Sequence, residues 1–172
     1  YKSIAEAFIH AGASEEIDVK LKWIYSGDLE NGNAEDYLKD LDGILIAPGF
    51  GDRGIEGKIT AAKYARENNI PLLGICLGMQ IVTIEFARNV LGFEKANSME
   101  FDDNSPYPVI SLMEEQKDVI NKGGTMRLGA WKCELKPNTK IAEIYNAELI
   151  SERHRHRYEF NNDYIEDYEK KG

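Results

Sequence analysis

The chain has 172 residues, 42% of them hydrophobic, which is enough to build the core of one domain. Its net charge of −9 is opposite in sign to the surface that nucleic-acid-binding proteins present to phosphates, which excludes that class of partner. No run approaches the ~18 apolar residues of a membrane span, the first residues lack a secretory pattern and the two cysteines are far apart, so we expect a cytoplasmic protein with no membrane partner.

Helices and strands alternate along the first half of the sequence. The spacing of apolar residues predicts helices over 2–11, 55–69 and 79–91, and strands over 17–24, 42–48 and 70–75. Strands that alternate with helices in this way build a parallel sheet with helices on both faces. The predicted fold class is therefore α/β, and functional residues are expected beyond the carboxyl ends of the strands.

The second half of the sequence changes to short strands joined by turns. Apolar segments over 106–112, 127–135, 141–145 and 157–160 predict an antiparallel extension that continues from the parallel core. No linker-like composition separates the two halves, so residues 1–172 are interpreted as a single domain. The acidic and aromatic tail over 163–172 is expected to be a frayed or helical end.

The most informative segment is an apolar strand that runs into Gly74-Ile-Cys76-Leu-Gly78 and then into a helix. Glycines on both sides allow the sharp elbow that lifts a residue above the carboxyl end of a sheet. The dipole of the helix favours a thiolate at its amino end, and the amides of Leu77 and Gly78 would face whatever Cys76 attacks. Cys76 is therefore a candidate nucleophile, and the alternative is a small buried core residue.

Two other glycine-rich segments are candidates for a site. Pro48-Gly49-Phe50-Gly51 follows the strand over 42–48, and a glycine there lets a backbone N–H approach an oxyanion; the alternative is a tight strand-to-helix turn. The segment from Gly123 to Gly129 combines a flexible loop with Arg127 but lacks the Lys-Ser/Thr ending of a phosphate loop. Its alternative is a glycine turn ahead of a strand.

Three arginines and two histidines lie between Glu152 and Glu159 in an otherwise acidic chain. In a strand the arginines share one face and the histidines share the other, which places Arg153, Arg155 and Arg157 opposite His154 and His156. Such a run is usually a solvated face. A metal site at the two histidines is disfavoured because the neighbouring cations would repel the ion.

Taken together, these segments resemble one known family. Residues 74–80, 48–54, 123–129 and 153–161 are similar to motifs of the glutaminase domain of the CTP synthases, which are class I, triad-type glutamine amidotransferases. The first of these motifs indicates only the broad class, and the last two are specific to CTP synthases. The resemblance covers essentially the whole chain and implies a flavodoxin-like α/β fold.

The resemblance also implies an activity and its partners. It implies that L-glutamine is hydrolysed through a cysteine thioester, and that the ammonia passes to an N-terminal amidoligase domain of the same chain, which uses ATP and Mg²⁺ to aminate UTP to CTP. It further implies that GTP activates the whole enzyme, that this enzyme is a homotetramer, and that the glutaminase domain itself holds no cofactor or metal.

The family's functional residues fall on matching positions of this sequence. Cys76 corresponds to the nucleophile, and Gly49 and Leu77 to the donors of the oxyanion hole. Glu100 suits the α-ammonium of glutamine, and Arg157 contributes through its backbone as well as its charge. The residues that the resemblance assigns to glutamine binding are Gly49, Leu77, Gly78, Met79, Gln80, Glu100 and Arg157.

The sequence departs from the family pattern in two ways. Pro48 stands where many members have a glycine, and because proline has no N–H, Gly49 remains the donor in this loop. The family's catalytic His and Glu lie in a His-x-Glu motif that does not occur here, and none of His10, His154 and His156 fits that position. We therefore expect a domain that is incomplete at both ends, without its first strand, its His-x-Glu segment or the amidoligase domain, and inactive by itself.

Two alternative functions stay open at this point. Another class I amidotransferase is disfavoured by the Arg-His-Arg-His-Arg run. A non-catalytic binding or regulatory module of the same fold is favoured by the missing base and disfavoured by Cys76.

Overall fold

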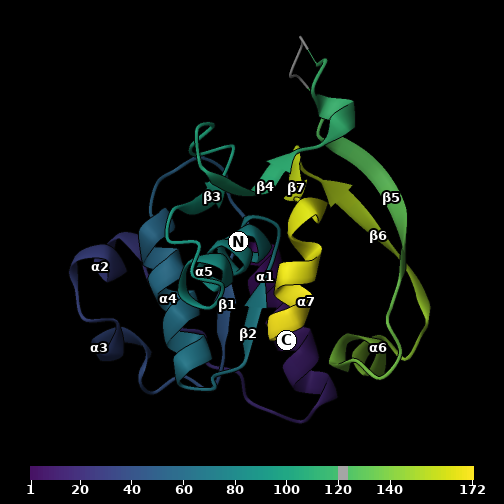
Figure 1. Ribbon diagram of the computed structural model, residues 1–172. Helices are drawn as coiled ribbons and strands as arrows, with labels where there is room; N and C mark the ends of the chain where they lie inside the picture. The colour runs from purple at the N-terminus through teal and green to yellow at the C-terminus, as the bar shows by residue number, and fades with distance from the viewer. Residues whose placement is uncertain (120–123) are drawn as a thin grey trace.

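The computed structural model describes residues 1–119 and 124–172, and Figure 1 shows the arrangement of their helices and strands. The helices are α1 (Lys2–Ser14), α2 (Ser26–Asn31), α3 (Ala34–Leu38), α4 (Ile55–Glu67), α5 (Leu77–Asn89), α6 (Lys140–Tyr145) and α7 (Ile165–Lys171), with short 3₁₀ helices η1 (Glu114–Gln116) and η2 (Asn162–Tyr164). The strands are β1 (Ile44–Ile46), β2 (Leu72–Gly74), β3 (Ala96–Ser98), β4 (Tyr107–Leu112), β5 (Arg127–Glu134), β6 (Leu149–Arg155) and β7 (Tyr158–Phe160). None of the described helices is long and apolar enough to cross a membrane.

The first half pairs its strands in parallel, as predicted. β1 and β2 are parallel neighbours, with Leu45 opposite Leu73. β3 and β4 are also parallel, and β7 joins the other edge of β4 in the antiparallel direction. The predicted strands over 42–48 and 70–75 are confirmed as β1 and β2, and both are followed by loops at the same edge because they run in the same direction.

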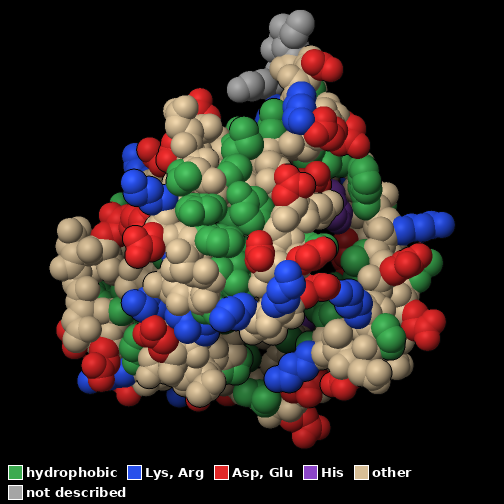
Figure 2. All heavy atoms as spheres, viewed as in Figure 1, with side chains coloured by type: hydrophobic (Ala, Val, Ile, Leu, Met, Phe, Trp, Pro, Cys, Tyr) green, Lys and Arg blue, Asp and Glu red, His purple; other side chains and the backbone are tan. Residues whose placement is uncertain are grey.

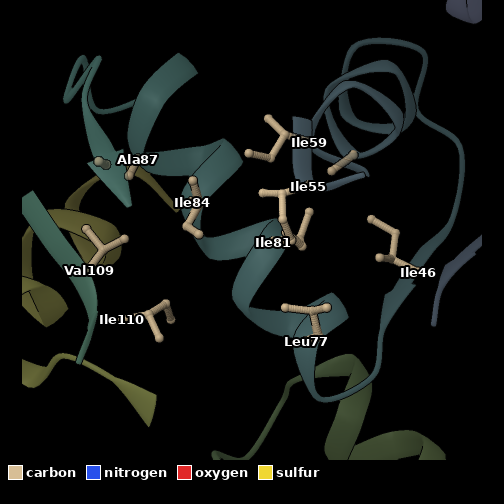
Figure 3. Packing of buried hydrophobic residues seen from close by; sticks show 11 residues of the cluster. Ile46, Ile55, Ile59, Leu77, Ile81, Ile84, Ala87, Val109 and Ile110 are labelled. Carbon is tan, nitrogen blue, oxygen red and sulfur yellow. The ribbon is translucent and has the colours of Figure 1, made fainter. Parts of the chain in front are cut away.

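Helix α5 is the centre of the packing. It contacts α4, the two strands of the β1–β2 sheet and the three strands of the β3–β4–β7 sheet. Leu77, Ile81 and Ile84 recur at helical spacing on its buried face, and each is at most 2% exposed. Figure 3 shows these side chains between the isoleucines of α4 on one side and Val109 and Ile110 of β4 on the other. The first turn of α5, which follows directly on Cys76, is therefore anchored in the main core.

The antiparallel extension of the second half is also confirmed. β5 and β6 form a ribbon in which Trp131 lies opposite Glu152, and Figure 1 shows this ribbon standing off the body of the molecule with α6 at its far end. The predicted tail is helical: Tyr168 of α7 stacks on Phe86 and donates its hydroxyl to the carbonyl of Thr83 at 2.7 Å. Figure 2 shows that hydrophobic side chains gather over the centre of the face seen in Figure 1, while charged side chains surround them.

The strand predicted over 17–24 is wrong. No strand is present between α1 and α2, and the side chains of Ile17 and Trp23 are each 63% exposed. A strand is stable only where a neighbouring strand receives its N–H and C=O groups, and no described strand pairs with this segment. Alternation of apolar residues alone does not supply that neighbour.

The strand predicted over 141–145 is also wrong, because α6 occupies these residues. Thr139 caps this helix, with its hydroxyl oxygen accepting from the amide of Ala142 at 3.4 Å. Ile141, Ile144 and Tyr145 are spaced as residues on one face of a helix. This spacing indicates a helix, although the apolar composition of the segment also suits a strand.

The packing of α5 predicts the cost of a cavity in the core. Ile81 is fully buried, so Ile81→Ala should lower the free energy of unfolding by about 2–5 kcal/mol, measured by urea denaturation. Ile144 on α6 is 76% exposed, so the matched change Ile144→Ala should cost less than about 0.5 kcal/mol. Equal costs for the two variants would contradict the central place of α5.

Candidate active site

A cavity of about 310 Å³ opens where the loops after β1 and β2 meet the segment between β6 and β7. Parallel strands place their carboxyl ends at one edge, which is where the sequence analysis expected a site. Segments far apart in the chain contribute to its wall. The lining residues are Gly49, Phe50, Cys76, Leu77, Gln80, Glu100, Met126, His156, Arg157 and Tyr158.

Cys76 occupies a strained elbow between β2 and α5. Its backbone lies at φ 56° and ψ −108°, outside the usual helical and strand regions, and it stands at the amino end of α5. Glycine is required on both sides of Cys76 because the backbone of α5 approaches β1 and β2 too closely for a side chain. A Cβ at Gly74 would lie 2.5 Å from the backbone of Gly78, and a Cβ at Gly78 would lie 2.1 Å from the carbonyl oxygen of Ile46. The predicted elbow is thereby confirmed.

The thiol of Cys76 is partly exposed and faces the cavity. Its Sγ lies 4.0 Å from the carbonyl oxygen of Arg155, at the end of β6. Cys76 also stands directly before the first residue of α5, a helix of thirteen residues. The thiol is therefore open to a ligand at the start of this helix.

The residues of the candidate oxyanion donors are neighbours in the cavity wall. A Cβ at Gly49 would lie 3.2 Å from a side-chain methyl of Leu77, and both residues line the cavity. The amide of Gly78 is already used, since it donates to the carbonyl of Ile75 at 2.9 Å. Gly78 is therefore not available to stabilise an oxyanion, and the donors left from the sequence analysis are Gly49 and Leu77.

Glu100 is brought to the glycine loop from the chain between β3 and β4. Its carboxylate accepts from the amide of Gly51 at 3.4 Å, and its own amide donates to the hydroxyl of Ser98 at 3.1 Å. Burial, and after it the charge of Glu100, raise the pKa of the Tyr158 phenol. The carboxylate thus lines the same cavity as Cys76, where its negative charge suits a ligand ammonium.

Gln80 offers a buried acceptor to a ligand. It is 4% exposed, and its amide nitrogen donates to the carbonyl of Tyr158 at 3.4 Å. Its oxygen has no hydrogen-bond partner among the described residues. Buried polar atoms without partners are costly, so a ligand N–H in the cavity would satisfy it.

Arg157 lies in the break between β6 and β7 rather than on the face of a strand. Its guanidinium donates to the side-chain oxygen of Gln116 at 2.5 Å and to the hydroxyl of Thr125 at 2.9 Å. Its carbonyl accepts from the amide of Met113 at 2.9 Å. Both the backbone and the side chain of Arg157 are therefore held against the segment that precedes β5.

Of the three histidines, His156 lines the cavity, while His10 is exposed on α1. His154 Nδ1 lies 3.0 Å from His156 Nε2, and His156 Nδ1 has no partner among the described residues. Burial, and after it the charge of His154, lower the pKa of His156. No hydrogen bond joins Cys76 to a described histidine, and no group of three or more metal-ligating side chains occurs in the described part of the chain.

The family model "Glutamine amidotransferase class-I" matches residues 1–171. The chain belongs to this family. Among its relatives are the CTP synthases of Flavobacterium johnsoniae and Cytophaga hutchinsonii, which are 59% and 60% identical over all 172 residues. The solved structure of the Trypanosoma brucei CTPS glutaminase domain with bound acivicin is 40% identical, has a TM-score of 0.90 and is matched by the whole chain over 66% of its own length. The chain spans about a third of the length of the curated relatives, 32% in both cases.

The amidotransferase fold gathers most of the residues that the sequence assigned to the site. Cys76, Gly49, Leu77, Gln80, Glu100 and Arg157 all line the cavity. Gly78 and Met79 do not: Gly78 is buried against β1, and Met79 is 41% exposed on α5. Gly123, at the start of the predicted loop, lies outside the described residues.

Four lining residues of the amidotransferase cavity have no role in the site predicted from the sequence. Phe50 and Met126 belong to the two glycine-rich candidate segments, His156 belongs to the arginine and histidine run, and Tyr158 follows Arg157. Met126 and His156 reach the cavity only because the ribbon folds back beside Cys76. No spacing in the sequence indicates that fold.

The elbow predicts that Gly78 tolerates no side chain. Gly78→Ala would push a Cβ into the Ile46 carbonyl, so we expect α5 to shift, a loss of about 3 kcal/mol in stability and slower reaction of Cys76 with a thiol reagent such as Ellman's reagent. Gly43→Ala is the matched control, because a Cβ there meets only the Pro71 carbonyl at an ordinary 3.6 Å. Unchanged stability and thiol reactivity in Gly78→Ala would refute the close approach.

Proposed function

We propose that this chain is the glutaminase part of a CTP synthase and hydrolyses L-glutamine through a thioester on Cys76. The observation that carries the proposal is the strained cysteine elbow at the floor of a cavity whose wall holds a carboxylate and an arginine. The α-amino acid end of glutamine needs one anion and one cation, and its side-chain amide needs a nucleophile and donors. Glu100, Arg157, Cys76 and the pair Gly49 and Leu77 supply these groups.

The proposed chemistry begins with attack by the Cys76 thiolate on the side-chain amide carbon of glutamine. The carbonyl oxygen becomes an oxyanion that accepts from the amides of Gly49 and Leu77. The C–N bond then breaks, and the nitrogen takes up a proton and leaves as ammonia. Water attacks the resulting γ-glutamyl thioester, which releases glutamate and returns the thiol.

The other partners in the proposal belong to the complete protein. We propose that the ammonia reaches an amidoligase domain that uses ATP and Mg²⁺ to aminate UTP, that GTP activates the reaction, and that the complete enzyme is a cytoplasmic homotetramer. The similarity to CTP synthases along the whole chain supports this assignment over another class I amidotransferase. The glutaminase part is proposed to need no cofactor or metal of its own.

Cys76→Ala tests the nucleophile in the complete protein. Glutamine-dependent CTP formation should fall by at least about a thousandfold, while synthesis from added ammonia persists, because only the thioester route needs the thiolate. Cys133→Ala is the matched control: Cys133 is exposed on β5, and both activities should stay within about twofold. Loss of both activities in Cys76→Ala alone, or full glutamine-dependent activity in this variant, would refute Cys76 as the nucleophile. A parent protein that makes CTP from ammonia and not from glutamine would favour a non-catalytic module.

Glu100→Ala tests the binding of the α-ammonium group. The KM for glutamine should rise by the equivalent of ~1–3 kcal/mol, the worth of one charge-assisted contact, with a smaller change in kcat. Glu94→Ala removes an exposed carboxylate nearby in the chain and should leave KM unchanged. A normal KM in a folded Glu100→Ala protein would remove Glu100 from the substrate site.

The 172-residue chain by itself should hydrolyse glutamine only at the background rate. Turnover needs a base to accept the thiol proton and later to activate water, and no described histidine is hydrogen-bonded to Cys76. A diazo-ketone analogue of glutamine should still label Cys76 slowly, because the thiol is partly exposed and lines the cavity. Steady hydrolysis that disappears in His154→Ala or His156→Ala would show instead that the base lies in the arginine and histidine run.

A further inference from the structure

Gln116 is a buried polar residue that the chemistry described so far does not use. It ends the short helix η1 and is 7% exposed. A buried amide is costly unless its oxygen and its nitrogen both find hydrogen-bond partners. The position of those partners therefore indicates why a glutamine stands there.

Both ends of the Gln116 amide are bonded within one small network. Its oxygen accepts from the guanidinium of Arg157 at 2.5 Å, and its nitrogen donates to the carbonyl of Thr125 at 3.2 Å. The hydroxyl of Thr125 in turn accepts from Arg157 at 2.9 Å. Gln116, Thr125 and Arg157 thus form a closed ring of three side chains and one carbonyl.

The backbone reinforces this ring. The amide of Met113 donates to the carbonyl of Arg157, and the amide of Gln116 donates to the carbonyl of Met113, both at 2.9 Å. Met113 is itself 4% exposed, so η1 begins from a fixed point in the core. Gln116 therefore approaches Arg157 from a short helix that is tied to the core through Met113.

The ring lies at the wall of the cavity. Arg157 and Met126, the residue after Thr125, both line it. An arginine side chain has several rotatable bonds, and binding a ligand to it is weakened by the entropy lost on ordering. An arginine that is already held in place binds without that loss.

We propose that Gln116 is a positioning residue for glutamine binding, which holds Arg157 in the orientation that meets the substrate before the substrate arrives. This inference rests on the proposed function, since it takes Arg157 as part of the glutamine site. Gln116 itself does not line the cavity and reaches the substrate only through Arg157. Its effect should therefore fall on KM, not on the chemical step.

The test uses the complete protein and compares three variants by steady-state kinetics with glutamine and with ammonia. Gln116→Met keeps the length of the side chain and removes both hydrogen bonds, and should raise the KM for glutamine about tenfold with kcat within about twofold. Gln116→Glu keeps an acceptor for Arg157 and should stay within about threefold of the parent KM. Glu115→Met makes the same new side chain at an exposed neighbour in η1 and should leave KM unchanged.

A double-mutant cycle with Arg157→Met completes the test. If Gln116 acts through Arg157, Gln116→Met should add little to the KM of Arg157→Met. An unchanged KM in Gln116→Met, equal defects in Gln116→Met and Gln116→Glu, or fully additive defects in the cycle would each overturn the proposal. Failure of the proposed function itself is distinguishable, because Cys76→Ala would then leave glutamine-dependent activity intact.

Discussion

The close approach of α5 to the sheet is the constraint on which the rest of the structure depends. The backbone of Gly78 packs against the carbonyl of Ile46, and Gly74 packs against Gly78, at distances that any Cβ would violate. Of the three residues between Gly74 and Gly78, Cys76 is the one that takes a positive φ, at 56°. Strain of this kind persists where the surroundings hold it in place, and it is typical of functional sites.

The same helix serves the core and the site. Leu77 is 2% exposed and packs in the main cluster, yet it directly follows Cys76 and its side chain lies next to Gly49. The proposed nucleophile Cys76 is therefore bonded directly to a core residue. Electrostatic stabilisation of an oxyanion depends on rigidity, because donors that are already aimed need no reorganisation during the reaction.

The sequence was sufficient for the features that local sterics determine, and insufficient for those that tertiary contacts determine. The position of Cys76 can be predicted because flanking glycines between a strand and a helix are typical of a sharp elbow that exposes the residue at its tip. The prediction of a strand over 17–24 is wrong because no neighbouring strand among the described residues pairs with it. The prediction of a strand over 141–145 is wrong because Thr139 caps a helix there. No sequence pattern indicates a role for Gln116, since its hydrogen bond with Arg157 joins residues 41 positions apart.

The proposed hydrolysis requires that the γ-glutamyl group of glutamine becomes covalently attached to Cys76. Acid quenching of the complete protein during turnover of isotope-labelled glutamine, followed by peptide mapping with mass spectrometry, would detect this adduct. We expect a γ-glutamyl adduct on the peptide that contains Cys76 and none on the peptide that contains Cys133. Glutamine turnover with no adduct on Cys76 in any quenched sample, or with the adduct on Cys133, would contradict the proposed hydrolysis.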